Sequence, residues 1–531
     1  MNIQTAFLGV SLLLFAGCAK TGHPMEKKGQ DLRINLQREP ASLDPRIGND
    51  VGASQVHFML FEGLLRLNPD MTLSPAQAKS WEISSDEKMY TFYLDDANWS
   101  NGVPVTAFDF ERSWKSVLSP DFPCPDAYLL YSIKNAYSAK QGALPLSDVG
   151  IRAVDEKTLV VELELPTPHF LQIVASSVLL PINMDMEDKN PNWAVSPSHF
   201  ICNGPFQFKE WKVNDEMIFE KNPYFRKAND VKLNNVFINI IDREMIALHM
   251  YASGYFDLIG APLSCFPTVF HQELDKKNLL TFFPVAMSKF LAFNTNVFPF
   301  NNANMRRAFS YAVNRNAIVK HITQLQEEPA LNIIPPVLLP EEAPPLFIDA
   351  DLEKARECLE VGLKELNITK DDLKNLSFMY CSSELNHLIT QHLQNEWSKV
   401  LGITVRLENV DFKALHERSS KGDYEIGLFI WVAEYGDAMN ILERFCDKKS
   451  HRNYSKWSHL GYNEILNQAM KTSCPKERFE KILEAEKILV DEMPITCLFH
   501  SNYAFLIQPH VRGFGISPLG QIYFDQISIA P

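Results

Sequence analysis

The sequence predicts a mixed α/β fold in which helices and strands are interleaved along the chain. Two observations indicate this class. Segments with alternating apolar residues, or rich in β-branched and aromatic residues, are separated by segments whose apolar residues recur every three or four positions. The chain has 531 residues, of which 46% are hydrophobic and 22% charged, so it is long enough for roughly two to four domains. This interleaving favours layered α/β or α+β domains.

Four segments are predicted to be strands. Residues 32–36 alternate as Leu-Arg-Ile-Asn-Leu, which is the pattern of a half-buried strand. Residues 90–94 and 158–165 are rich in β-branched and aromatic side chains. Residues 403–407 follow Gly402, which is expected to end a helix, and form the fourth segment.

The predicted helices are marked by their caps and by apolar residues on one face. The first begins after Thr106, a suitable N-cap residue with Asp109 three positions later. Further helices are predicted over residues 304–321, 385–401 and 477–492. Gly402 ends the second of these, and Pro494 lies just beyond the third.

An apolar run at the start of the sequence ends in Ala16-Gly17-Cys18. Residues 6–15 form this run, which is too short to cross a bilayer because a spanning helix needs about 20 residues. It has the length of the apolar region of a signal peptide. The small residues before Cys18 resemble the lipobox of bacterial lipoproteins. That resemblance implies that residues 1–17 are removed, that Cys18 is acylated, and that the mature protein lies in the periplasm, anchored to a membrane by lipid.

Two features depart from the lipobox pattern. Residues 1–5 contain no Lys or Arg, and Phe15 stands where Leu is usual. The alternative is an ordinary buried helix that contains Cys18. If the lipoprotein interpretation holds, the polar residues 18–31 are a lipidated tether to the folded part.

Charge and cysteine content restrict the classes of function. The formal net charge is −14, which argues against nucleic acid as a partner and is compatible with peptides, cations or neutral solutes. Nine cysteines are present, none of them in a C-x-x-C motif, so zinc-ribbon and thioredoxin-like sites are not indicated. Both disulfides and buried free thiols remain open for the eight cysteines that follow Cys18.

The sequence offers no convincing catalytic centre, and we expect neither an enzyme nor a cofactor or metal site. Ser85 and Lys88 satisfy the S-x-x-K motif, but they stand in a polar turn and no K-T-G follows. His387 and His392 are five positions apart on a predicted helix and so do not share a face. Phosphate-binding glycine motifs and the G-x-S-x-G nucleophile motif are missing from the sequence.

A colinear series of ten motifs resembles a known family. It includes Ser42-Leu-Asp-Pro45, Phe61-Glu-Gly-Leu64, Trp81-Glu-Ile-Ser84, the segment 99–110, Asn203-Gly-Pro-Phe206 and Trp431-Val-Ala-Glu-Tyr435. Together they are similar to the large extracytoplasmic solute-binding proteins of ABC peptide importers, of the oligopeptide-binding type. The resemblance covers residues 32–531. Trp99, Phe110 and Trp114 are nevertheless expected to lie in the core and not in a site.

The resemblance implies a two-lobed, periplasmic-binding-protein-like fold with an extra N-terminal subdomain. The expected parts are lobe I (32–61, 183–285 and 495–531), the subdomain (62–182) and lobe II (286–494). An oligopeptide would be enclosed between the lobes, where exposed strand edges pair with its backbone and hydrated pockets take its side chains. A membrane permease of the ABC type would receive the peptide, and the receptor is expected to be a monomer.

The resemblance also suggests residues that contact the peptide. Relatives have an Asp that pairs with the α-ammonium group at the position of Glu434, and an enclosed carboxylate needs such a cation. Trp431 and Phe412 are suggested for side-chain pockets, and Asp50 and Val51 for the side of the peptide backbone. The remaining suggested residues are His500 near the last lobe crossover, Ile430 just before the Trp431 motif, and Tyr435 at its end.

Other positions depart from the family pattern and leave the cargo open. Basic residues that bind the peptide carboxylate in relatives are replaced by Leu428, Thr323 and Asn386, with His387 one residue away. Met287 and Val432 stand where some members have a disulfide. Peptidoglycan-derived peptides are therefore an alternative to ordinary oligopeptides. A metal chelate, haem or an oligosaccharide remains a further alternative, as do an enzyme, an adhesin and a chaperone.

Overall fold

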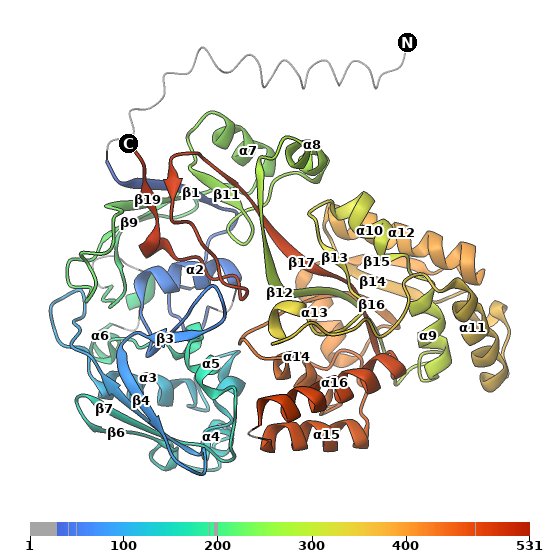
Figure 1. Ribbon diagram of the computed structural model, residues 1–531, viewed down its shortest axis with the longest axis horizontal. Helices are drawn as coiled ribbons and strands as arrows, with labels where there is room; N and C mark the ends of the chain where they lie inside the picture. The colour runs from blue at the N-terminus through green and yellow to red at the C-terminus, as the bar shows by residue number, and fades with distance from the viewer. Residues whose placement is uncertain (1–28, 41, 49, 191, 196–199, 473) are drawn as a thin grey trace.

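The computed structural model describes residues 29–40, 42–48, 50–190, 192–195, 200–472 and 474–531. The fold is mixed α/β and has two lobes, which Figure 1 shows as two groups of elements. The long strands β12 (Leu280–Phe293) and β17 (Ile495–Ile507) pair antiparallel and run from one group into the other. Within the described residues, no helix is both long enough and apolar enough to cross a membrane.

One mixed sheet extends through both lobes, in the order β15-β14-β16-β12-β17-β11-β1-β10-β9-β8. Its lobe I strands are β1 (Asp31–Leu36), β8 (Phe206–Lys212), β9 (Glu216–Lys221), β10 (Asn235–Ile240) and β11 (Leu258–Gly260). Its lobe II strands are β14 (Ser377–Cys381), β15 (Arg406–Val410) and β16 (Ile426–Val432). β1 is parallel to β10 and β11, and β14 is parallel to β15 and β16. The antiparallel β12 and β17 therefore connect two parallel units.

The subdomain has its own antiparallel sheet, in the order β4-β5-β7-β6. These strands are β4 (Ala78–Ile83), β5 (Met89–Leu94), β6 (Ile151–Asp155) and β7 (Thr158–Glu162). Helix α3 (Ala107–Val117) packs on this sheet and starts where the sequence predicted, because the Asp109 carboxylate accepts a hydrogen bond from the Thr106 backbone N–H at 2.8 Å. Trp99, Phe110 and Trp114 are fully buried, which confirms their expected place in the core.

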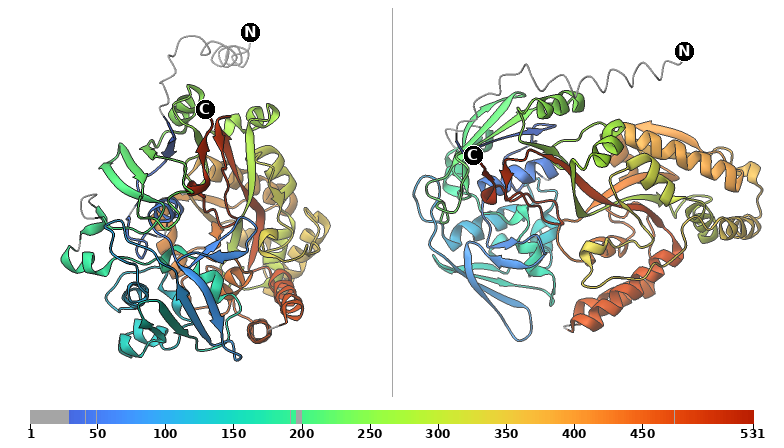
Figure 2. Two further views of the ribbon diagram at one scale, coloured as in Figure 1. Left: turned by 60° about the vertical axis from the view of Figure 1, so that its left-hand side comes forward. Right: turned by 45° about the horizontal axis from the view of Figure 1, so that its top comes forward.

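Lobe I and the subdomain contain further short elements. They are α2 (Val51–Leu60), β2 (Leu65–Leu67), β3 (Leu73–Pro75), η1 (Ala127–Leu130), α4 (Ala136–Lys140), α5 (Phe170–Val174), α6 (Met184–Lys189), α7 (Glu244–Ala252) and α8 (His271–Lys276). The C-terminal strands β18 (Val511–Arg512) and β19 (Ser528–Ile529) lie at the start of β1, as both views of Figure 2 show. There the Gln30 side chain exchanges two hydrogen bonds with the backbone of Ile529, at 2.8 and 2.9 Å.

Helices flank the sheet of lobe II. They are α9 (Ala303–Tyr311), α10 (Arg315–Ile318), α11 (Leu352–Leu366), α12 (Glu384–Leu401), α13 (Phe412–Lys421), α14 (Met439–Leu442), α15 (Leu460–Lys471) and α16 (Pro475–Glu492). The buried Trp397 ring of α12 joins α9 to the sheet, because it lies 5.1 Å from the Phe309 ring and 5.3 Å from the Phe378 ring. Its indole N–H donates to the Phe309 carbonyl at 2.9 Å.

Three predicted elements differ from the observed ones. The predicted helix 304–321 is interrupted after α9, because the Asn314 side chain accepts from the Ala317 backbone N–H at 2.9 Å and caps a new helix, α10. A π-helical turn, Val319–Thr323, follows α10. The predicted strand 403–407 forms three residues later, as β15, because its pairing with β14 starts at Arg406. The strand predicted over 158–165 ends at Glu162, where its pairing with β5 ends.

The apolar core has two main parts, and the chain passes between them on β12. Val285 belongs to the core shared by lobe I and the subdomain, whereas Ala286 belongs to the core of lobe II. The residue ranges of lobe I, the subdomain and lobe II stay a prediction, and the three names refer to these ranges throughout. All eight cysteines within the described residues are free, and Cys124, Cys202 and Cys497 are buried. Cys18 and the predicted signal peptide lie outside the described residues.

Candidate ligand-binding site

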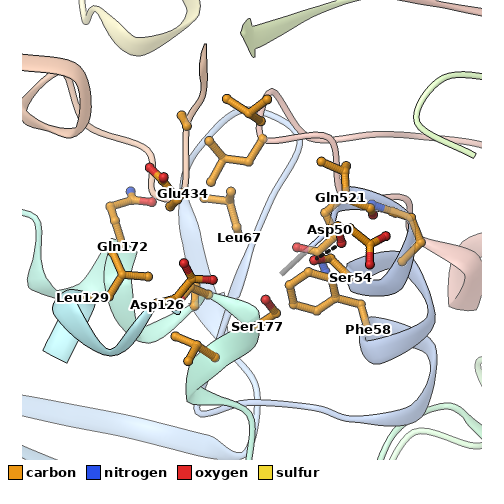
Figure 3. Close-up of a pocket in the computed structure, with 18 residues that line it drawn as sticks. Asp50, Ser54, Phe58, Leu67, Asp126, Leu129, Gln172, Ser177, Glu434 and Gln521 are labelled. Atoms are coloured by element: carbon orange, nitrogen blue, oxygen red, sulfur yellow. Dashed lines mark hydrogen bonds between the residues drawn. The ribbon is translucent and has the colours of Figure 1, made fainter. Parts of the chain in front are cut away.

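A cavity of about 410 Å³ lies where lobe I, the subdomain and lobe II meet. Lobe I contributes α2 and the C-terminal segment around Gln521, and lobe II contributes residues 432–434. The subdomain contributes Leu67 of β2 together with residues at η1 and from α5 to residue 178. Figure 3 shows Glu434 and Asp126 on one side of the cavity and Asp50, Ser54 and Phe58 on the opposite side. The volume is sufficient for a small part of a peptide.

The lobe I wall is fixed by the first turn of α2. Asp50 is the N-cap, and its carboxylate accepts from the Ala53 backbone N–H at 2.8 Å. The buried Gln55 side chain donates to the Gly520 carbonyl at 3.0 Å and accepts from the Ile522 backbone N–H at 2.9 Å. These bonds hold the C-terminal segment against α2, so the Gln521 side of the cavity is fixed as well.

Glu434 lines the lobe II wall and is held by two arginines. Its Oε1 accepts from Arg444 Nη2 at 2.6 Å, and Arg452 Nη2 lies 3.5 Å away. Burial alone would raise the pKa of Glu434, but the two guanidinium groups outweigh it and lower the pKa. The carboxylate is therefore ionised at neutral pH.

Asp126 provides a second carboxylate on the same side of the cavity. It is the N-cap of η1, yet its side chain makes no capping hydrogen bond there. Burial, together with repulsion from Glu434, raises its pKa to about 6 despite the opposing effect of Arg452 and Arg444. The cavity lining contains three carboxylates and, among the described residues, neither Lys nor Arg. Such a lining favours a cationic group of a ligand.

The subdomain and lobe II also touch each other directly beside the cavity. The Arg452 guanidinium lies over the Tyr128 ring, 3.8 Å from its centroid. The rings of His169 and Tyr435 are stacked at 4.8 Å with an angle of 5° between their planes. Both contacts join a subdomain residue to a lobe II residue, so the wall of the cavity is continuous across the two.

Residues 72–453 match the family of bacterial extracellular solute-binding proteins, family 5. The chain belongs to this family. The resemblance inferred from the sequence motifs is thereby confirmed. This solute-binding protein is 34% identical to the oligopeptide-binding protein OppA of Bacillus subtilis, and the match covers 98% of each chain.

Solved structures confirm the two-lobed fold of this solute-binding protein. The murein tripeptide binding protein MppA of Escherichia coli has a TM-score of 0.82 at 27% identity, covering 95% of this chain and 99% of MppA. Haemophilus influenzae OppA in complex with the peptide RPPGFSPFR has a TM-score of 0.80 at 25% identity, covering 95% of this chain and all of that one (100%).

The predicted contact residues of this solute-binding protein fall into two groups. Asp50, Val51 and Glu434 line the cavity. The others, all outside the cavity lining, are Trp431, Ile430, Tyr435, Phe412 and His500, while Cys18 lies beyond the described residues. Their roles as ligand contacts stay predictions.

The second group has varied surroundings. Trp431 is buried below the Arg444 guanidinium, which lies 5.8 Å from its ring, and Tyr435 is buried in the stack with His169. His500 is engaged on β17, where its Nδ1 is 2.8 Å from Ser288 Oγ, and burial lowers its pKa to about 4. Two apolar side chains are exposed, Phe412 (73%) and Ile430 (49%).

Sequence reasoning missed Asp126, Gln172 and Gln521, which also line the cavity. None of them stands in a motif, and they come from segments far apart in the sequence. The only local signal was a run of turn-forming residues around Asp126, which indicates a loop and not a site. Their convergence depends on the packing of the subdomain against both lobes.

Proposed function

We propose that this protein is an extracytoplasmic receptor that binds one oligopeptide between its lobes and delivers it to the permease of an ABC importer. The observation that carries the proposal is the cavity, whose walls come from lobe I, the subdomain and lobe II and include three carboxylates. The names of the relatives from Bacillus subtilis and Haemophilus influenzae, which refer to oligopeptides, support the choice of cargo.

We infer that the α-ammonium group of the peptide lies between Glu434 and Asp126. Burial and repulsion from Glu434 together raise the pKa of Asp126 to about 6, and an ammonium group there would offset the repulsion. The ammonium group would also donate to the Glu434 carboxylate, because the hydrogen bond from Arg444 uses only part of the acceptor capacity of this carboxylate. The first residues of the peptide would then run beside Asp50 and Val51 on one side and residues 432–434 on the other.

The same proposal includes a lipid anchor at Cys18, a periplasmic location and a monomeric receptor without catalysis or cofactor. The surroundings of the S-x-x-K motif, Ser85 and Lys88, support the absence of catalysis there. Lys88 Nζ donates to the Glu164 carbonyl at 3.0 Å, and Ser85 and Lys88 lie in the exposed turn between β4 and β5. An acylating serine instead needs its base beside it in an enclosed site.

Peptidoglycan-derived peptides are a second candidate cargo. The likeness to the murein tripeptide binding protein favours them. Such peptides carry amino-acid branches, and a second ammonium group on a branch would suit a cavity with three carboxylates. An ordinary oligopeptide without basic side chains has only one ammonium group to pair with a carboxylate.

The first experiment is native mass spectrometry of the soluble mature protein, residues 19–531, purified without denaturation. Denaturation then releases the co-purified molecules for identification. We expect short peptides at one per monomer, and branched peptides with D-residues would select the second cargo. A protein that carries no peptide, gains no thermal stability from a peptide library and is stabilised by a sugar or a metal chelate would refute the peptide receptor.

A further inference from the structure

Lys289 on β12 is a buried cation that has no partner among the described residues. Its side chain is only 8% exposed, and neither a hydrogen bond nor an ion pair connects its ammonium group to any described residue. Other buried cations are paired: Arg46 with Asp44 at 2.7 Å, Arg315 with Asp349 at 3.2 Å, and Lys456 with the Ser420 carbonyl at 3.0 Å. Lysine is almost never buried unless it is paired.

The register of the sheet places Lys289 on the face that carries an exposed apolar side chain. Lys289 lies directly opposite Ile430 in the antiparallel pair of β12 and β16, so the two side chains point to the same face. Ile430 is 49% exposed, so this face is open beside it. The two flanking pairs, which include Ser288 with Trp431, point to the other face.

Burial of the Lys289 ammonium group is energetically unfavourable unless an anion lies beside it. Burial disfavours the ammonium form and lowers the pKa of Lys289 to about 8, and the nearby Cys381 thiol offsets only part of that effect. The group is still mostly protonated at pH 7, so a charge stays where water is largely excluded. An anionic group of a bound ligand would stabilise the buried ammonium group and offset its desolvation.

We propose that Lys289 binds a carboxylate group of the ligand. The proposal rests on the proposed peptide receptor and names its second charged subsite. Ile430, opposite Lys289, precedes Glu434 by four positions, which corresponds to about 13 Å along an extended chain. A peptide whose ammonium group lies at Glu434 therefore brings a group about four residues along the chain to Lys289. That group is either the terminal carboxylate or the side chain of Asp or Glu.

The test uses isothermal titration of the mature protein with neutral peptides of three to six residues. Each length is prepared as the free acid, as the C-terminal amide, and as an amide with Glu at the last position. We expect one length of free acid to bind about tenfold to hundredfold more tightly than its amide. Preference for the Glu-containing amide at every length would instead identify a side-chain carboxylate.

Lys289→Met keeps the length of the side chain and removes the charge. We expect it to bring the ratio of acid to amide affinity to about one while the amide affinity stays within about threefold of wild type. Without ligand, its melting temperature should rise, because a buried charge that no described residue pairs is gone. A lysine with a merely structural role would instead lower the melting temperature and weaken acid and amide binding equally.

Lys399→Met is the matched control, because Lys399 is an exposed lysine of the same lobe and its removal should leave the ratio unchanged. The proposal is wrong if the wild-type protein does not distinguish acid, amide and Glu-containing peptides, or if Lys289→Met keeps the preference. In either case peptides still bind and the receptor function stands. Failure of the wild-type protein to bind any of these peptides would overturn both proposals.

Discussion

The carboxylate of Glu434 is joined to the guanidinium group of Arg444, with 2.6 Å between Oε1 and Nη2. The family resemblance assigned this carboxylate to the ammonium group of a peptide, yet it has protein partners before any ligand arrives. Both functions are compatible, because a carboxylate has about four acceptor sites and Arg452 approaches only to 3.5 Å. A bound ammonium group would thus join an existing cluster of charges.

Glu434→Gln should weaken both the fold and ligand binding. The substitution leaves Arg444 and Arg452, which are largely buried, without their carboxylate, so the free energy of unfolding should fall by about 1–3 kcal/mol. Peptides with a free N-terminus should bind at least about tenfold more weakly, whereas their N-acetylated forms should be affected less. Chemical denaturation and calorimetric titration measure the two effects. Glu480→Gln, an exposed residue of α16, is the control. Equal losses for free and acetylated peptides would remove Glu434 from ammonium binding.

Asp126 should make peptide affinity depend on pH near 6. Its pKa is raised to about 6 by burial and by Glu434, so the carboxylate takes up a proton below that pH. A bound ammonium group requires the ionised form, so affinity should fall by about tenfold between pH 7 and pH 5. Asp126→Asn should bind more weakly at pH 7 and lose this dependence. Asp121→Asn, an exposed neighbour in the same loop, should keep it. A pH dependence that persists in Asp126→Asn would assign it to another group.

The stack of His169 on Tyr435 should make the protein sensitive to mild acid. Burial lowers the pKa of His169 from 6.5 to about 4, so the folded state keeps the imidazole neutral while the unfolded chain takes up a proton. Stability contributed by this group is complete above pH 6.5 and is lost as the pH falls toward 4. Between pH 7 and pH 5 the loss is about 2 kcal/mol.

His169→Phe keeps an aromatic ring at the stack and removes the titrating group. Its melting temperature should decline less than that of the wild-type protein between pH 7 and pH 5. His249→Phe changes an exposed histidine and should decline as the wild type does. Parallel decline of all three proteins would show that His169 does not contribute to the acid sensitivity.

Cys18 should determine where the protein resides in the cell. If the cysteine is acylated, wild-type protein made in a bacterium should sediment with membranes and partition into detergent. Cys18→Ser should be found in the soluble fraction outside the cytoplasm, or keep residues 1–17. Mass spectrometry of the N-terminal peptide measures the added acyl groups. Wild-type protein that is soluble and unmodified would refute the lipid anchor.

Some parts of the fold could be predicted because their causes are local. The Thr106–Asp109 helix start and the end of α12 at Gly402, where φ is 72°, each depend on a few adjacent residues. Other parts failed for the opposite reason. The helix predicted over 304–321 has a continuous apolar face, but Asn314 starts a second helix and the packing of lobe II decides where the first one ends. The strand after Gly402 depends on its pairing with β14, which residues 403–407 alone do not specify.

By itself the sequence determined the class of fold and the motifs of a solute-binding family, and it suggested Asp50, Val51 and Glu434 as ligand contacts, which stays a prediction. Only the tertiary structure decided which charges meet. It brought Asp126 beside Glu434, supplied Glu434 with its arginines, and buried Lys289 where the described part of the chain gives it no partner. The physical reason is that local propensity depends on neighbours in the chain, whereas the energy of a charge depends on burial and on partners that only folding brings within a few ångströms.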